Sequence, residues 1–130
     1  MAYTTINKST DYFDTTLITG NGSTQNITGL GFQPDLIWMK RRNNTGHNRL
    51  IDAVRGSNKL IQSDLTNAEG TDATYVTSFN SDGWSIGTNT DINGSGGTSV
   101  GWSWLGANGT SSNTDGSITS TVSANTTAGF

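Results

Sequence analysis

The apolar residues of this chain fall into short runs with a two-residue period, and turn-forming dipeptides separate the runs. The clearest run is Thr98–Leu105. Val100, Trp102 and Trp104 alternate there with small residues, as expected for a strand that buries one face. The pattern therefore predicts that Trp102 and Trp104 point into one core.

Comparable segments recur along the whole chain, divided by dipeptides such as Asn21-Gly22 and Asp82-Gly83 that tolerate the positive φ of tight turns. We expect strands near Thr15–Thr19, Asp35–Arg41, Arg49–Arg55, Lys59–Ser63, Thr74–Phe79, Gly83–Gly87, Thr98–Leu105 and Ser117–Ser123. One helical turn is predicted at Asp64–Gly70, and a hairpin turn at Asp91–Gly96.

The segment Gly31–Lys40 contains the only proline of the chain, Pro34, and then four consecutive large apolar residues. Pro34 favours an extended conformation before it, and the apolar run is too short for a free-standing helix. It predicts a strand covered on both faces. The stretch Lys40–Arg49 is basic and polar and predicts a long exposed loop.

Composition supports an all-β fold, because the chain has a single Glu, 13% charged residues and 17 Gly, while Thr, Val, Ile and aromatic residues dominate the apolar runs. Eight short strands leave no room for crossover helices and predict a jelly-roll-like sandwich of two antiparallel sheets. We expect one domain over residues 1–113 and a polar C-terminal segment over residues 114–130. The predicted core includes Trp38, Trp102, Trp104, Leu36, Val54, Val76 and Phe79.

Several classes of function are disfavoured by the composition. No apolar run approaches the roughly 20 residues that span a bilayer, and no secretory signal is visible at the N-terminus. The absence of cysteine excludes disulfides, thiolate nucleophiles and zinc–thiolate sites. A net charge of −3 argues against general nucleic-acid binding. We therefore expect neither membrane insertion nor a nucleic-acid partner.

Five motifs occur in a fixed order: the start Met1–Asn7, then Gly31–Lys40, Asp52–Gly56, Ser78–Trp84 and Val100–Trp104. In this combination the chain resembles, over essentially its whole length, a domain family of marine tailed-phage virion proteins. The resemblance implies a concanavalin-type jelly roll in a tail-fibre-like, spike-like or capsid-decorating protein. Longer members of that family carry a second module that begins near a segment like residues 114–130, so the resemblance implies that this chain is either a one-module member or a fragment.

From this resemblance we expect a non-enzymatic structural protein of the virion, produced in the bacterial host cytoplasm. Its expected partners are other virion proteins, host cell-surface glycan or both, and further copies of itself in an oligomer or array. The alternative function is a soluble carbohydrate-binding, lectin-like module. A third hypothesis is a polysaccharide depolymerase, which the scarcity of catalytic residue types disfavours.

No catalytic, cofactor or metal site is predicted. His47 and Glu69 are the only residues of their types, and Asp91–Gly96 spaces oxygen ligands as a calcium loop does but lacks the bidentate Glu downstream. The tryptophans could form a sugar-stacking platform, although their pattern favours core packing. The basic loop is either a solvated loop whose cations pair with Asp35 or Asp52, or a surface that binds a partner or glycan. The binding candidates are Arg42, Asn43, Asn44, His47 and Arg49.

Overall fold

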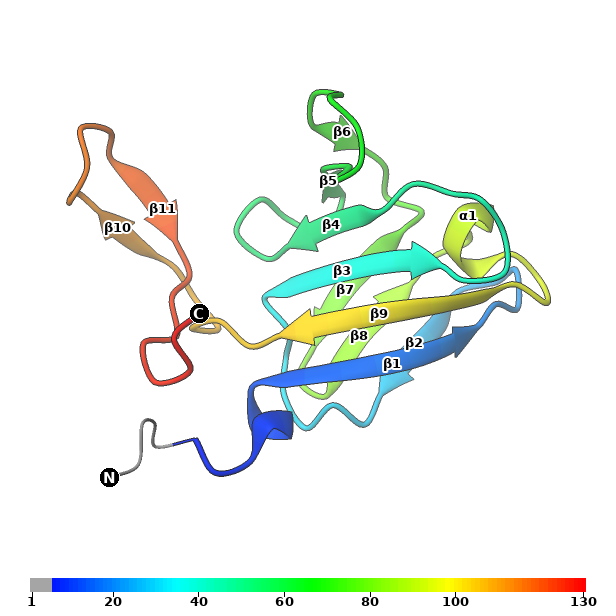
Figure 1. Cartoon of the computed structure of the whole chain (residues 1–130), viewed down its shortest axis with the longest axis horizontal. Coiled ribbons are helices and arrows are strands. Elements are labelled where there is room, and N and C mark those ends of the chain that lie inside the picture. The colour runs from blue at the N-terminus through cyan, green and yellow to red at the C-terminus, as the bar shows by residue number, and fades with distance from the viewer. Residues whose placement is uncertain (1–5) are drawn as a thin grey trace.

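A computed structural model describes residues 6–130, and the first five residues, part of the N-terminal motif, lie outside the described residues. Within residues 6–130 the fold is all-β, with two antiparallel sheets stacked face to face (Figure 1). The four-stranded sheet has the order β1 (Phe13–Thr19), β9 (Thr98–Trp104), β3 (Leu36–Arg41), β4 (Arg49–Asp52). The three-stranded sheet has the order β2 (Gln25–Thr28), β8 (Gly83–Ile86), β7 (Val76–Asn80). The expected all-β class is confirmed.

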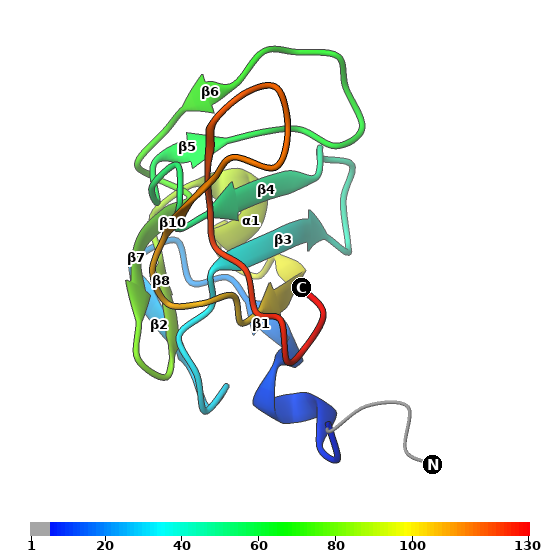
Figure 2. The ribbon, with the colours of Figure 1, turned by 90° about the vertical axis from the view of Figure 1, so that its left-hand side faces the viewer.

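Two small hairpins and two short helical turns complete the described chain. They are β5 (Lys59–Leu60) with β6 (Gly70–Thr71), β10 (Ser111–Asn113) with β11 (Ser120–Val122), η1 (Ser9–Asp11) and α1 (Thr90–Asn93). Reciprocal backbone hydrogen bonds between Leu50 and Ile61 attach the first hairpin to β4. The β10–β11 hairpin projects from one end of the molecule (Figures 1 and 2). The domain boundary predicted after residue 113 falls inside this hairpin.

All eight predicted strand segments contain a strand, but the helical prediction is wrong. Residues 64–70 form a turn and an extended stretch that enters β6, since Leu65 is exposed and no apolar face holds a helix there. Helix instead occurs at α1, where a hairpin turn was expected. Asn89 caps it by accepting a hydrogen bond of 3.0 Å from the Asp91 N–H, and Ile92 anchors it in the core.

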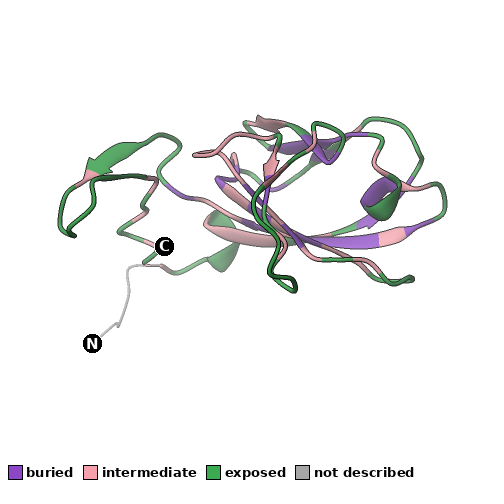
Figure 3. Ribbon diagram, turned by 90° about the horizontal axis from the view of Figure 1, so that it is seen from above, coloured by how far each residue is buried: buried purple, intermediate pink, exposed green. Residues whose placement is uncertain are grey.

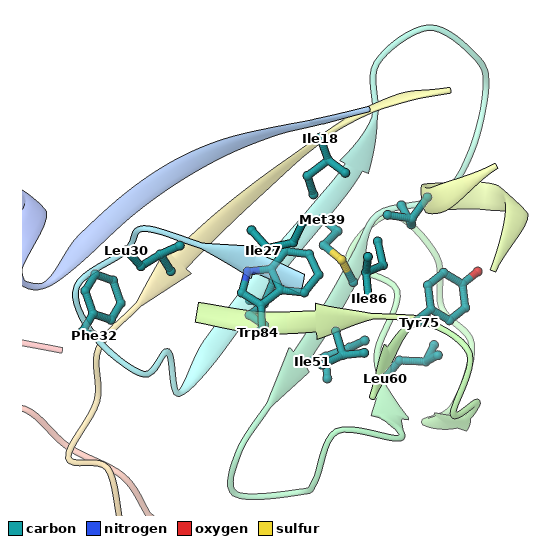
Figure 4. Packing of buried hydrophobic residues seen from close by; sticks show 13 residues of the cluster. Ile18, Ile27, Leu30, Phe32, Met39, Ile51, Leu60, Tyr75, Trp84 and Ile86 are labelled. Carbon is teal, nitrogen blue, oxygen red and sulfur yellow. The ribbon is translucent and has the colours of Figure 1, made fainter. Parts of the chain in front are cut away.

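The core lies between the two sheets and is centred on Trp84, which is fully buried (Figure 4). Ile37 and Met39 of β3 meet it from the opposite sheet, and both are fully buried. The remaining buried apolar residues are Ile18, Ile27, Leu30, Phe32, Ile51, Leu60, Tyr75, Val76, Ile86 and Ile92.

The placement of three tryptophans reverses the sequence-based prediction. Trp38, Trp102 and Trp104 are only partly buried and lie on the outer face of the four-stranded sheet. The buried face of β9 instead carries small residues, because Trp84 occupies the space: a Cβ added to Gly101 would lie 3.0 Å from Trp84 Cζ2. A two-residue period identifies two faces but not which one is buried.

Of the other predicted core residues, two contribute to the core and two are partly exposed outside it. Val76 is fully buried, and Phe79 packs against the core. Leu36 is partly exposed on the outer face, and Val54 is partly exposed after β4, outside the core cluster. The strand predicted to be covered on both faces is therefore covered on one. Figure 3 shows that buried residues are concentrated in the two stacked sheets, whereas the projecting hairpin is mostly exposed.

Two buried serines on the inner face of β9 provide a matched pair. The Ser99 hydroxyl donates a hydrogen bond of 2.8 Å to the Ile92 carbonyl, whereas the buried Ser103 Oγ has no partner among the described residues. An unpaired buried hydroxyl costs about 1–3 kcal/mol. We expect Ser103→Ala to raise the free energy of unfolding by about 1 kcal/mol and Ser99→Ala to lower it by a similar amount. Urea denaturation checks both, and equal losses for the two variants would contradict the assignment.

Candidate functional site

Residues 42–48 form the loop that joins β3 to β4. Arg41, the last residue of β3, holds the start of this loop in place. The Arg41 guanidinium donates from Nε to Asn43 Oδ1 at 2.7 Å and from Nη1 to the Thr90 carbonyl at 2.8 Å. Asn43 Oδ1 also accepts from the Thr98 N–H at 3.0 Å. Arg41 lies so close to Gly97 that a Cβ there would come within 2.4 Å of its guanidinium. These contacts fix the start of the loop to α1 and β9.

The end of the loop is fixed by Arg49, which is only 6% exposed. Its Nη2 lies 3.0 Å from Asp91 Oδ2, and its guanidinium carbon lies 5.0 Å from the centre of the Tyr75 ring. The Tyr75 hydroxyl donates to the same Asp91 oxygen at 2.8 Å. Burial, with this hydrogen bond to Asp91, raises the pKa of Tyr75 to about 12. Arg49 is thus engaged in internal contacts.

A hollow of about 470 Å³, here called the loop hollow, opens beside the loop and is lined by Lys40, Thr45, Gly46, His47, Asp64 and Asp91. His47 Nδ1 lies 3.0 Å from Asp64 Oδ2, and the Asn48 N–H donates to Asp64 Oδ1 at 3.1 Å. Desolvation raises the pKa of Asp64, but these hydrogen bonds outweigh it and hold that pKa below its ordinary value. Both carboxylate and imidazole groups therefore face this hollow.

The predicted binding residues are distributed unevenly around the loop hollow. His47 lines it. Asn44 Oδ1 accepts a hydrogen bond of 2.8 Å from the Thr45 N–H. The Arg42 side chain is exposed and has no ion-pair or hydrogen-bond partner among residues 6–130. Asp64 was missed, and Asp91 was considered only within the segment Asp91–Gly96, because no local pattern connects either residue to the loop.

The expected pairing of loop cations with Asp35 or Asp52 is not observed. Asp52 instead accepts from Arg55 Nε at 2.6 Å, and Arg55 also reaches Glu69. None of the ion pairs among the described residues includes Asp35. No group of three or more acidic or histidine side chains within residues 6–130 is arranged to hold a metal ion.

The outer face of the four-stranded sheet forms a second candidate surface, here called the aromatic face. It consists of alternate residues of three neighbouring strands: Phe13, Leu17, Leu36, Trp38, Val100, Trp102 and Trp104. Register places Trp38 opposite Trp102, with ring centres 5.5 Å apart, and Phe13 opposite Trp104, at 5.0 Å. Phe130 stacks on Trp104 at 6.1 Å. Figure 1 looks onto this face, and no other strand crosses in front of it.

The aromatic face ends at β1, an edge strand whose outward backbone groups are partly occupied by side chains. Asp14 Oδ1 accepts from the Thr15 N–H at 2.7 Å. Gln25 Nε2 donates to the Thr19 carbonyl at 3.2 Å. Such contacts hinder the addition of a foreign strand to a sheet edge. Leu17, between these two positions, is 66% exposed on the face itself.

Comparisons with known proteins assign a family without assigning an activity. One family model, described as a domain of unknown function, matches residues 8–130, almost the whole chain. No curated protein and no solved structure matches. Among the described residues, no helix has the length and apolar character needed to cross a membrane.

Proposed function

We propose that this chain, which belongs to the DUF7483 family of domains of unknown function, is a non-enzymatic structural module of a bacteriophage virion, tail-fibre-like, spike-like or capsid-decorating. The observation that carries the proposal is the aromatic face, an apolar surface on a small sandwich that no other described strand covers and that Phe130 contacts at its Trp104 end. The resemblance of its five motifs to marine tailed-phage virion proteins supports the virion as its location. We further propose a concanavalin-type jelly roll, consistent with the two stacked antiparallel sheets.

Self-association through the aromatic face follows from its composition and from the occupied edge beside it. Burial of apolar surface stabilises an interface by about 25 cal/mol per Å² before the costs of association. Leu17, which is exposed, and Trp38 and Trp102, which are partly exposed, provide such surface. Because Asp14 and Gln25 hinder strand addition at β1, copies would meet through side chains rather than by extending a sheet. The proposed product is a homo-oligomer or regular array.

Substitution of one exposed leucine tests this assembly. Leu17→Lys places a charge in the aromatic face at a position 66% exposed, so the fold should tolerate it. We expect the dissociation constant of the oligomer to rise at least about tenfold, since a desolvated unpaired charge costs well over 1.4 kcal/mol. Ile118→Lys is the matched control, because Ile118 is 79% exposed away from this face. Sedimentation equilibrium measures both variants.

A wild-type protein that stays monomeric at millimolar concentration would contradict the proposed assembly, as would equal effects of the two lysine variants. The virion location has its own test. Mass spectrometry of purified particles of the encoding phage should find this chain in many copies. Particles that lack it, or that assemble intact after deletion of its gene, would refute the structural role.

The loop hollow stays free in such an assembly, because residues 42–48 lie beyond the end of β3 rather than on the aromatic face (Figure 1). We propose that exposed loop residues, Arg42, Asn44 and His47 among them, contact the host surface or a neighbouring virion protein. Their amides, guanidinium and imidazole supply both donors and acceptors. Asn43 and Arg49, which hold the loop in shape, would contribute by positioning it.

The alternative function, a carbohydrate-binding module, is favoured by one observation. Trp38, Trp102 and Trp104 lie on the outer face, where indole rings can stack on the apolar faces of sugars. A glycan array distinguishes the candidates. Saturable binding by the monomeric Leu17→Lys protein that is lost in Trp102→Ala would favour the carbohydrate-binding module over the assembly role of this face.

A further inference from the structure

Asp35, which immediately precedes β3, carries a buried carboxylate that the described residues only half satisfy. The residue is 4% exposed. Its Oδ2 accepts a hydrogen bond of 3.0 Å from the Asn108 N–H, whereas its Oδ1 has no hydrogen-bond or ion-pair partner within residues 6–130. Oδ1 is not among the unpartnered side-chain atoms that are sealed from solvent, so it keeps some exposure. Asp35 lines a space beside it.

That space is a hollow of about 220 Å³, lined by Gln33, Asp35, Ala53, Val54, Asn108, Gly109 and Thr110 and here called the Asp35 hollow. Its polar side chains offer oxygen from a carboxylate, two amides and a hydroxyl, without sulfur or imidazole. The volume lies below the roughly 300–1,000 Å³ typical of pockets for drug-sized ligands. It suits a small ligand with a few bound waters.

The walls of the Asp35 hollow are held by short backbone contacts. The Asp35 N–H donates to the Trp104 carbonyl, and the Ala53 N–H donates to the Asp35 carbonyl, both at 2.8 Å. A Cβ added to Gly106 would lie 2.9 Å from Asp35 Oδ2. Asn108 has a φ of +51°, the only positive φ of a non-glycine residue among those described. The carboxylate is thus fixed by three chain segments that meet at this end of the molecule.

We propose that the Asp35 hollow binds a calcium ion. A buried carboxylate without a cation is costly, and proteins pair such charges or use them as metal ligands. Ca²⁺ accepts carboxylate, amide, carbonyl and water oxygens in irregular geometry, whereas Mg²⁺ requires a nearly ideal octahedron. Asp35 supplies the charge, Gln33, Asn108 and Thr110 supply neutral oxygens, and water completes the coordination. With one carboxylate, the affinity belongs to the weak class, with a dissociation constant of about 10⁻⁴–10⁻³ M.

Calcium binding in the Asp35 hollow is independent of the proposed virion role, because metal binding is measured on the isolated chain. The probes are CaCl₂, MgCl₂ and EDTA in thermal unfolding, and Tb³⁺ luminescence sensitised through the indole of Trp104, whose carbonyl contacts Asp35. We expect about 10 mM CaCl₂ to shift the folding equilibrium toward the native state about tenfold or more. MgCl₂ should have a smaller effect.

Asp35→Asn keeps the shape of the side chain and removes its charge, so it should abolish both the calcium shift and the Tb³⁺ signal. Asp115→Asn, in the exposed β10–β11 turn, is the matched control and should retain both. If Asp35→Asn does not fold, Thr110→Val replaces it, with calcium affinity expected to fall several-fold. Unchanged unfolding of the wild type in calcium, or a calcium shift that survives in the substituted protein, would overturn the assignment.

Discussion

Replacing Trp84 by alanine should lower the free energy of unfolding by about 3–5 kcal/mol, a large part of the stability of a domain of this size. Trp84 is fully buried between the two sheets and packs against Gly101, where no side chain could move in to fill the cavity. The loss therefore combines the transfer term with the cost of a large void. Equilibrium denaturation in urea measures it.

Trp102→Ala is the matched comparison, because it removes the same side chain from the opposite face of the four-stranded sheet. Its indole is partly exposed and contacts Trp38 at 5.5 Å, so we expect a loss of only about 1–2 kcal/mol. A larger loss for Trp102→Ala than for Trp84→Ala would mean that the core lies on the outer face of the four-stranded sheet, and would contradict the structure. The sequence-based prediction placed Trp102 in the core and did not include Trp84 among the core residues.

Asn93→Ala should lower the free energy of unfolding by about 3 kcal/mol or more. Asn93 is fully buried, and its amide nitrogen donates at 2.7 Å both to the Ser23 carbonyl and to the Gly87 carbonyl. Its Oδ1 accepts from the Asn21 N–H at 3.2 Å and from Gln25 Nε2 at 2.6 Å. Truncation removes all four hydrogen bonds and leaves the buried Gly87 carbonyl without this donor, and a buried polar group without a partner costs more than a bond contributes.

Thermal and urea unfolding of two variants check this role. Asn67→Ala is the control, since Asn67 is exposed and makes one side-chain hydrogen bond, to Gln62 Oε1 at 3.1 Å. It should change the free energy of unfolding by less than about 0.5 kcal/mol. Similar small effects for both variants would mean that the amide of Asn93 does not join α1 to the chain around residues 20–25.

The strands could be predicted because their alternation and their turn dipeptides are local. Strand β2 was missed, since Gln25–Thr28 contains one apolar residue and its place is set by pairing with β8. The choice of inner face was also missed. Ser99, Gly101 and Ser103 line the core although they are less apolar than the residues between them. Small residues are needed there because the Trp84 side chain of the other sheet fills the space. That choice depends on a residue far away in the sequence.

The candidate sites show the same division between local and distant information. The basic composition of residues 40–49 identified a polar loop, and its exposed members remain binding candidates. Composition could not show that Arg49 is buried against Tyr75, because that contact joins the two stacked sheets. It also could not show that Asp64 faces His47, because the pairing of Leu50 with Ile61 brings those segments together. The sequence placed Asp35 at the start of the strand Asp35–Arg41, without indicating its burial. Its burial follows from the return of residues 106–108 over the start of β3.

The position of β9 between β1 and β3 also determines when the protein can fold during its synthesis. Thr19 pairs with Thr98, so β1 leaves the ribosome about 80 residues before the strand that joins it to the rest of its sheet. At about 5–20 residues per second, this delay lasts several seconds. During that interval β1 and β3 have no shared partner, and their apolar residues stay accessible to chaperones and to other nascent chains. Translation speed between the end of β1 and the start of β9 should therefore influence the yield of native protein more than translation speed after β9.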